Sequence, residues 1–458
     1  MKNKRWIAFL VFTIFILTGC QSSDPVRNPA KEETTSRTEP IQMPSVQETG
    51  VLPVSYDGRK EGRVPPVKNQ GTLGTCWAFA SLQALEASLL PGESYNFSED
   101  HMSLGNGFCI PQEEGGEFTM SLAYLLSWKG PVLESDDPYG DGISPEGLNP
   151  VKHVQEIQMI PGKDYEKIKR AVLQYGGVQS SLYTSMTDEN SRSSSYNEEA
   201  YAYCYIGSQL PNHDSVIIGW DDTYPKENFN TEVNGDGAFI CLNSWGKGFG
   251  DQGYYYVSYY DSNIGMNNLV YAAAEDPDNY DHIYQSDLRG WVGQLGYGED
   301  TVWISNVYEA KDNETLSAVG FYATDSNTSY EIYGVPEAKD QTDIINGGDL
   351  NRRMLLAEGS FQNAGYYTVN LSEDFNEASE ESGEAVKMSK GERFAVVVKI
   401  TTPSTVHPAA IEYDAGDGRT FVDISDGEGY ISPDGINWER VEEKQNCNLC
   451  LKAYTKDR

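Results

Sequence analysis

The feature that most constrains this chain is a cysteine placed between a glycine-containing loop and an amphipathic helix. Gly71 and Gly74 mark a tight loop, and Cys76 follows two residues later. Apolar residues then recur at the spacing of one buried helix face, at Ala78, Leu82, Leu85 and Leu89. A Pro-Gly pair at 91–92 ends the pattern. We therefore expect Cys76 at the N-terminus of a buried helix, where the helix dipole and free N–H groups favour a thiolate.

A reactive thiolate needs an imidazole partner and a third group that orients the imidazole. The chain has 5 histidines, and His213 stands out because the apolar run 216–220 follows it. That run predicts a buried strand with His213 at its start. Asn243 closes a second predicted strand, 238–242. Cys76, His213 and Asn243 therefore occur in an order and in settings suited to nucleophilic catalysis.

Three segments around these residues carry a family resemblance. They are 68–79 (KNQGTLGTCWAF), 212–213 (NH) and 243–250 (NSWGKGFG) with the following Gly253–Tyr254. They resemble the cysteine, histidine and asparagine motifs of the papain family of cysteine peptidases. The resemblance implies an α+β papain-like fold over residues 51–275, in which a helical lobe and a β-barrel-like lobe meet at a cleft between Cys76 and His213.

The resemblance also implies a role for each matching residue. Cys76 is the nucleophile, and His213 pairs with it and later protonates the leaving amine. Asn243 orients His213, and Trp245 shields the hydrogen bond between them from water. The side-chain amide of Gln70 and the backbone N–H of Cys76 form the oxyanion hole. This acyl-transfer chemistry requires no metal and no cofactor, and we expect neither.

Two further positions are candidates for substrate binding. The pair Gly115–Gly116 resembles the glycines whose backbone binds an extended substrate in this family, and glycine permits such close approach. Asp214 directly follows His213, where the family commonly has a small apolar residue. Its carboxylate favours a basic substrate side chain, raises the pKa of His213, or points to solvent. Leu73 also departs from the family, which usually has a disulfide-forming cysteine there.

The N-terminal sequence is typical of an export signal. Lys2, Lys4 and Arg5 precede an apolar run at 6–17, which is too short to span a bilayer. The run ends in Leu-Thr-Gly-Cys at 17–20, which resembles a bacterial lipobox. It predicts a signal peptide over 1–19, lipidation of Cys20 and a disordered tether over 20–50. We expect a lipoprotein on the extracellular face of a bacterial membrane, in a Gram-positive envelope, that touches the membrane only through its lipid.

The C-terminal half is a series of short β-runs. They lie at 301–307, 318–322, 330–333, 366–371, 393–400 and 448–454. Such a series predicts an all-β sandwich over residues 282–458. Parts of it resemble the lectin-like module that follows some bacterial papain-type peptidases. That name leaves a glycan or cell-wall ligand as one expectation and a purely structural sandwich as another. The CxxC spacing at 447–450 lacks a second ligand pair, so we expect structural cysteines there.

The net charge of the chain excludes nucleic-acid binding as a function. The chain carries 34 Lys and Arg against 69 Asp and Glu, a net charge of −35, which repels nucleic acid. The leading expectation is therefore a surface-tethered cysteine endopeptidase that acts on extracellular proteins or peptides. Two alternatives stay open from the sequence: a cell-wall peptide hydrolase with the same Cys-His chemistry, and a non-catalytic adhesin built on a peptidase scaffold.

Overall fold

The structure is a computed structural model that describes residues 10–11, 41–42, 50–336, 353–371, 386–416 and 418–458. The predicted signal peptide, Cys20 and the predicted tether lie outside these residues, apart from two short strands, β1 (Leu10–Val11) and β2 (Ile41–Gln42). In the described part of the chain, every helix is too short or too polar to cross a bilayer.

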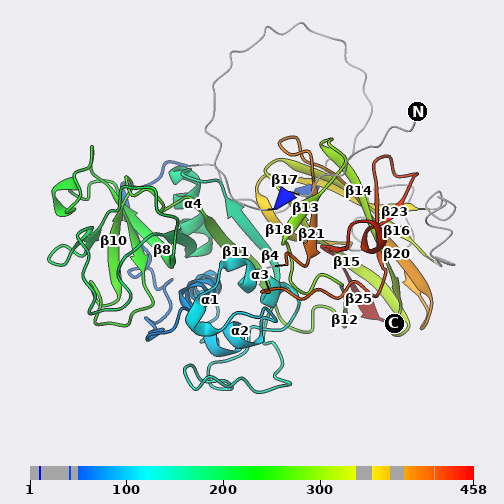
Figure 1. Cartoon of the computed structure of the whole chain (residues 1–458), viewed down its shortest axis with the longest axis horizontal. Coiled ribbons are helices and arrows are strands. Elements are labelled where there is room, and N and C mark those ends of the chain that lie inside the picture. The colour runs from blue at the N-terminus through cyan, green and yellow to red at the C-terminus, as the bar shows by residue number, and fades with distance from the viewer. Residues whose placement is uncertain (1–9, 12–40, 43–49, 337–352, 372–385, 417) are drawn as a thin grey trace, which may run out of the picture.

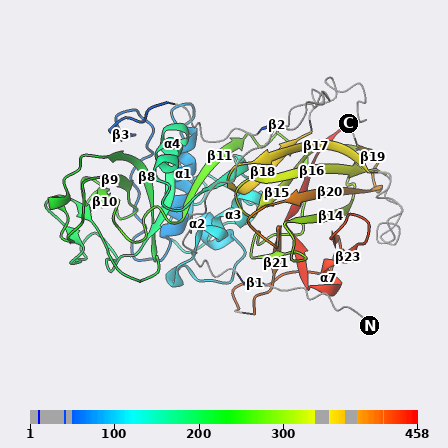
Figure 2. The same ribbon diagram turned by 90° about the horizontal axis from the view of Figure 1, so that it is seen from above.

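Residues 50–275 contain the main helices, which the two views place between strands β8–β10 and the β-rich C-terminal region (Figures 1 and 2). The helices are α1 (Cys76–Leu89), α2 (Glu99–Gly105), η1 (Gln112–Glu114), α3 (Phe118–Leu126), α4 (Tyr165–Tyr175) and η2 (Lys226–Asn228). The strands are β3 (Ser55–Asp57), β4 (His153–Ile160), β5 (Val178–Leu182), β6 (Tyr196–Asn197), β7 (Ala202–Tyr203), β8 (His213–Asp221), β9 (Ala238–Leu242), β10 (Tyr254–Ser258) and β11 (Asn268–Glu275).

Residues 282–458 are almost entirely β-structure. The strands are β12 (His282–Tyr284), β13 (Gly293–Leu295), β14 (Thr301–Glu309), β15 (Glu314–Ala323), β16 (Thr328–Val335), β17 (Met354–Phe361), β18 (Ala364–Asn370), β19 (Lys387–Met388), β20 (Arg393–Thr401), β21 (Ala409–Tyr413), β22 (Gly429–Ser432), β23 (Glu439–Arg440), β24 (Cys447–Leu449) and β25 (Leu451–Asp457). One short helix, α7 (Val441–Lys444), precedes β24.

The helix expected after Cys76 is α1, which begins at Cys76 itself. Its predicted apolar face is buried: Ala78, Leu82 and Leu85 are fully inaccessible and share one core with Val216 of β8. The helix ends at Leu89, two residues before Pro91. Packing against the sheet therefore places the N-terminus of α1 beside the start of β8, which begins at His213.

One sheet of 14 strands runs through both regions, in the order β12-β25-β15-β18-β4-β11-β5-β8-β9-β10-β7-β6 with β3 and β19 at its sides. The regions join where β18 pairs with β4, with Ala364 opposite Met159 and Tyr367 opposite Glu156. From the sequence we expect two neighbouring domains, and neither half of the chain carries a signal for this shared sheet. Backbone hydrogen bonds therefore connect the helical region directly to the β-rich region.

The C-terminal region is the expected sandwich. A seven-stranded sheet, β2-β17-β16-β20-β14-β22-β23, packs over the β25-β15-β18 end of the large sheet. Their shared core includes Val302 and Val396 from the first sheet and Phe321 and Val369 from the second, each at most 1% exposed. A third sheet, β1-β13-β21-β24, adds four strands. Each strand expected from residues 301 onward has a counterpart among these elements.

Candidate active site

Cys76 lies in the first turn of α1, half-buried, and the backbone N–H of Asp214 donates a hydrogen bond to its sulfur. The loop before it depends on Gly74, where a Cβ would lie 2.7 Å from the backbone N of Gly115. That distance is too short for any side chain, so the loop and the Gly115 segment pack backbone to backbone. The contact holds the helix N-terminus against the segment predicted to bind substrate.

The environment disfavours charge on Cys76 and His213 individually. Burial raises the pKa of the Cys76 thiol to about 12, and the nearby Asp214 carboxylate adds to the increase. Burial lowers the pKa of His213, although its hydrogen bond to Asn243 and the Asp214 charge both oppose that shift. Burial therefore disfavours the thiolate and the imidazolium when each is considered alone.

His213 is oriented through its Nε2 atom, which lies 2.8 Å from Oδ1 of Asn243. The same Oδ1 accepts the backbone N–H of Ser244 at 2.8 Å, so it is an oxygen and Nε2 must carry the hydrogen. In the neutral ring, Nδ1 is then the lone-pair nitrogen that can take the thiol proton. Trp245, 3% exposed, covers the imidazole at 4.7 Å between ring centroids and 31° between planes.

Among the described residues, Gln70 uses only one of its two amide hydrogens. Its Oε1 accepts the hydroxyl of Ser244 at 2.6 Å, and its Nε2 donates to the carbonyl of Leu73 at 2.7 Å. An amide nitrogen carries two hydrogens, so one remains for a ligand. The N–H of Cys76, in the first turn of a helix, also lacks an intrahelical acceptor. Gln70 and Cys76 can therefore supply the two expected oxyanion donors.

The glycine pair is required by its surroundings. Gly115 has φ +89°, which favours glycine, and a Cβ on Gly116 would stand 2.3 Å from Nε1 of Trp77. That indole nitrogen is buried and has no hydrogen-bond partner among the residues that the structure describes. The backbone of Gly115–Gly116 is therefore bare of side chains, as binding of an extended peptide requires.

Asp214 does not point to solvent, because it is 7% exposed. Its Oδ2 accepts a hydrogen bond from the side-chain amide of Gln179 at 2.8 Å. Its charge raises the pKa of His213, as the sequence suggested, but burial outweighs that effect and the net shift is downward. Selection of a basic substrate side chain by Asp214 stays a prediction.

Sequence comparison assigns residues 52–274 to the papain family cysteine proteases and residues 283–455 to the lectin-like domains. The N-terminal part of the chain is a papain-family cysteine peptidase domain. The second part is a lectin-like domain. Among curated relatives, the probable cysteine protease RD19B of Arabidopsis thaliana is 28% identical over 49% of this chain, and pro-cathepsin H of Mus musculus is 29% identical over 46%. The chain spans only 63% and 61% of these two proteins.

Solved structures match across both domains. Two structures of the cysteine protease Cwp84 superpose with a TM-score of 0.75 at 27% identity. One, determined after propeptide cleavage, covers 88% of this chain and 99% of its own. The other contains the cysteine protease and lectin-like domains of Cwp84, described as a surface layer associated protein of Clostridium difficile, and covers 90% of each chain. The pairing of a peptidase domain with a lectin-like domain is thus shared.

The peptidase domain also contains supporting residues that the sequence analysis missed. Tyr139 donates to the carbonyl of Gln70 at 2.9 Å and lies 2.6 Å from the hydroxyl of Thr75, so it braces both sides of the Cys76 loop. It comes from an irregular segment without periodicity. The segments that resemble the papain family lie elsewhere in the chain, and none of them includes Tyr139.

A buried ion cluster lies beside the segment that carries Gln70. Lys68, two residues before Gln70, places its Nζ 2.8 Å from Glu86 of α1 and 2.7 Å from Glu99 of α2. Two carboxylates share one ammonium, and burial raises the pKa of Glu99 to about 8. The cluster ties the segment that carries Gln70 to both helices.

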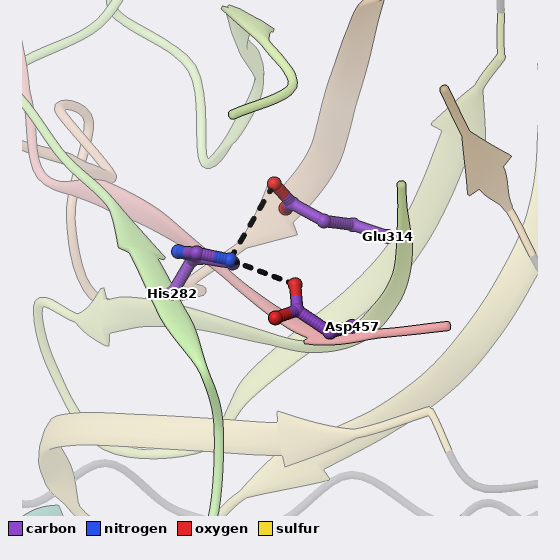
Figure 3. Close-up of side chains that lie close together, drawn as sticks. All are labelled: His282, Glu314 and Asp457. Atoms are coloured by element: carbon purple, nitrogen blue, oxygen red, sulfur yellow. Dashed lines mark hydrogen bonds and ion pairs between the residues drawn. The ribbon is translucent and has the colours of Figure 1, made fainter. Parts of the chain in front are cut away.

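The lectin-like domain contains one group with metal-ligating side chains among the described residues (Figure 3). Nε2 of His282 lies 2.9 Å from Asp457 and 3.7 Å from Glu314. The Glu314 carboxylate is fully buried and already accepts hydrogen bonds from Tyr284 at 2.8 Å and from Thr455. These contacts tie the first strand of the domain, β12, to the last, β25.

Proposed function

We propose that this chain is a surface-anchored cysteine endopeptidase that hydrolyses peptide bonds of extracellular proteins through Cys76, His213 and Asn243. The observation that carries the proposal is the hydrogen bond from His213 Nε2 to Asn243, which leaves Nδ1 as the proton acceptor in a site that also holds Cys76. Membership of residues 52–274 in the papain family supports the same assignment.

In the first half of the reaction, the Cys76 thiol transfers its proton to Nδ1 of His213 and the thiolate attacks the carbonyl carbon of the scissile bond. A C–S bond forms and the carbonyl electron pair moves onto oxygen. The Gln70 amide and the Cys76 N–H donate to that oxyanion, a type of stabilisation that is worth about 100- to 1,000-fold in kcat per donor. The C–N bond then breaks as the imidazolium protonates the leaving amine.

The second half releases the acyl group. Nδ1 of His213 accepts a proton from a water molecule as the water oxygen attacks the thioester carbon. The same two donors hold the second oxyanion. The C–S bond breaks, the carboxylic acid product leaves, and the sulfur regains a proton from the imidazolium. Asn243 keeps the ring aligned through both halves, and Trp245 limits the access of water to their hydrogen bond.

The test is titration of the full chain with an epoxysuccinyl thiol-directed inhibitor, together with hydrolysis of fluorogenic dipeptidyl amides. We expect one inhibitor bound per chain and cleavage that disappears in Cys76→Ala. Cys109→Ala is the matched control because Cys109 is an exposed free cysteine, and it should react and cleave like the parent. Equal labelling and cleavage in Cys76→Ala would refute the assignment.

We also propose that lipidation of Cys20 anchors the protein to the outer face of the cell membrane. The lipobox-like sequence at 17–20 supports this, as does the surface-layer association of Cwp84. Expressed in a bacterium that processes lipoproteins, the chain should incorporate labelled palmitate and fractionate with membranes. Cys20→Ala should incorporate none. Equal incorporation by both would refute the anchor.

A further inference from the structure

Two cationic side chains, one from each domain, converge beside Gly107. Lys129 follows α3 in the peptidase domain, and Arg289 lies between β12 and β13 of the lectin-like domain. A Cβ built on Gly107 would stand 2.7 Å from Nζ of Lys129 and 2.7 Å from Nη1 of Arg289, so the two nitrogens are at most about 5.4 Å apart. Gly107 has φ +87°, a conformation that favours glycine, and the absence of a side chain there leaves room for both cations.

Neither cation is paired with a carboxylate in the part of the chain that the structure describes. Nζ of Lys129 donates to the backbone carbonyl of Asn106 at 3.0 Å. Nη1 of Arg289 lies 3.5 Å from the carbonyl of Leu288, and its Nε is buried without a hydrogen-bond partner among the described residues. The guanidinium also faces the ring of Phe108, with Cζ 6.0 Å from the ring centroid. The chain has 69 acidic residues against 34 basic ones, so two neighbouring cations without an acidic partner are unusual here.

The charged groups around the two cations do not neutralise them. Lys452 and Asp287 form a buried ion pair of their own at 2.6 Å. The carboxylate of Glu412 accepts the backbone N–H of Arg289 at 2.6 Å, and burial raises the pKa of Glu412 to about 7. Burial, together with the charge of Arg289, lowers the pKa of Lys129 to about 8, so Lys129 is still mostly protonated at pH 7. The local charge is therefore positive, and a bound anion would relieve the repulsion between the two cations.

The spacing and the donors suit a phosphate group. A charge-assisted N–H···O contact is about 2.7–2.9 Å long, so one anion can reach two nitrogens that are at most about 5.4 Å apart. The ammonium of Lys129 has hydrogens left after its bond to Asn106, and the guanidinium of Arg289 carries five N–H groups. These donors come from two side chains, and the oxygens of a phosphate point in more directions than the two coplanar oxygens of a carboxylate.

The site is accessible, and the charge of the whole chain limits the size of its ligand. Lys129, Arg289 and Gly107 are each half-buried, so an anion can approach from solvent. The net charge of −35 repels anions at a distance, and a polyanion would meet that repulsion along its whole length. A small phosphate, bound through short-range contacts, therefore fits the site better than an anionic polymer does.

We propose that Lys129 and Arg289 form a phosphate-binding site at the junction of the two domains. The ligand is inorganic phosphate or a small phosphate ester, and one cation from each domain holds it. Bound phosphate therefore links the domains at a point separate from the pairing of β4 with β18. The residues of the proposed catalytic site take no part, so the inference does not depend on peptidase activity.

The test is calorimetric titration of the full chain with inorganic phosphate at pH 7 and constant ionic strength. We expect one phosphate bound per chain. Lys129→Met and Arg289→Gln should each weaken binding by about 10- to 100-fold, because each removes hydrogen bonds between charged groups. Lys129→Arg keeps the charge and should retain binding. Lys60→Met and Arg393→Gln are the controls, because both residues are exposed, and they should bind phosphate like the parent.

Thermal unfolding tests the link between the domains. Phosphate should raise the Tm of the parent, and either single variant, Lys129→Met or Arg289→Gln, should abolish that rise although the two residues lie in different domains. Glycerol phosphate distinguishes the two sources of the ligand: binding as tight as that of phosphate identifies an ester site, and binding of phosphate alone identifies a site for the free ion. Both results support the proposal.

Three results would overturn it. One is a parent chain that binds no phosphate. Another is phosphate binding that persists unchanged in folded Lys129→Met and Arg289→Gln. The third is acetate binding as tight as phosphate binding, which would show that the site responds to negative charge alone.

Discussion

Replacing Asp214 by Asn should move the whole pH profile of kcat/KM toward acid. The Asp214 carboxylate raises the pKa of the Cys76 thiol, where it adds to the effect of burial, and it raises the pKa of His213 against the effect of burial. The two limbs of the profile report the two titration steps of the Cys76–His213 pair, and the charge of Asp214 raises the pKa of both members. Removing one negative charge therefore lowers both limbs, while the backbone N–H at 214 still bonds the sulfur.

The size of the shift follows from the geometry. Because the N–H of Asp214 contacts the sulfur, its carboxylate lies roughly 6 Å away, and at an effective dielectric constant of about 20 the repulsion is about 2.8 kcal/mol, or about 2 pKa units. The hydrogen bond from Gln179 and partial screening reduce this. We therefore expect each limb to move down by about 1 to 2 units.

The assay is kcat/KM for an uncharged dipeptidyl amide from pH 4 to pH 10, on enzyme whose active sites have been titrated. Asp214→Asn should be faster than the parent below the acid limb and slower above the alkaline limb. Asp276→Asn is the control, because Asp276 is exposed and pairs with Lys152. Limbs that stay in place, or that move in opposite directions, would refute the electrostatic coupling of Asp214 to the pair.

Three other substitutions test separate parts of the structure. Gly116→Ala puts a Cβ 2.3 Å from Nε1 of the Trp77 indole, so the Gly115–Gly116 segment must shift. We expect kcat/KM to fall by about 100-fold because the bound substrate is misplaced. An unchanged kcat/KM would show that this segment does not position substrate. Gln70→Ala removes an oxyanion donor, so kcat should fall about 100- to 1,000-fold with KM little changed, and a pure KM effect would contradict the role. Lys452→Met strands the fully buried carboxylate of Asp287 and should lower the free energy of unfolding by about 3–5 kcal/mol, measured by denaturant titration; a stability equal to the parent's would contradict the pairing.

The elements that carry Cys76 and His213 could be predicted because their signals are local. The spacing of Ala78, Leu82 and Leu85 indicated a buried helix that begins at Cys76, and the apolar run after His213 indicated the strand that carries it. Such patterns depend only on which residues recur on one face.

What could not be predicted depends on contacts between distant segments. His153 stacks on Trp128, which lies in a separate segment, with the ring centroids 3.7 Å apart. Tyr139 lies in a loop whose sequence gives no sign that its hydroxyl reaches Gln70. The pairing of Met159 with Ala364 joins strands from different domains, and strand register across such a distance leaves no periodic trace in either segment.

The pairing of β4 with β18 affects how the two domains unfold. A chain cut between the two domains would expose the backbone donors and acceptors of β4 along a bare strand edge, and such edges pair with other chains and aggregate. The two domains are therefore not independent units, and neither can be replaced without leaving a strand of the other unpaired. Heat or denaturant should melt them in a single transition, and a partner that pulls on the lectin-like domain pulls directly on the scaffold of the substrate cleft.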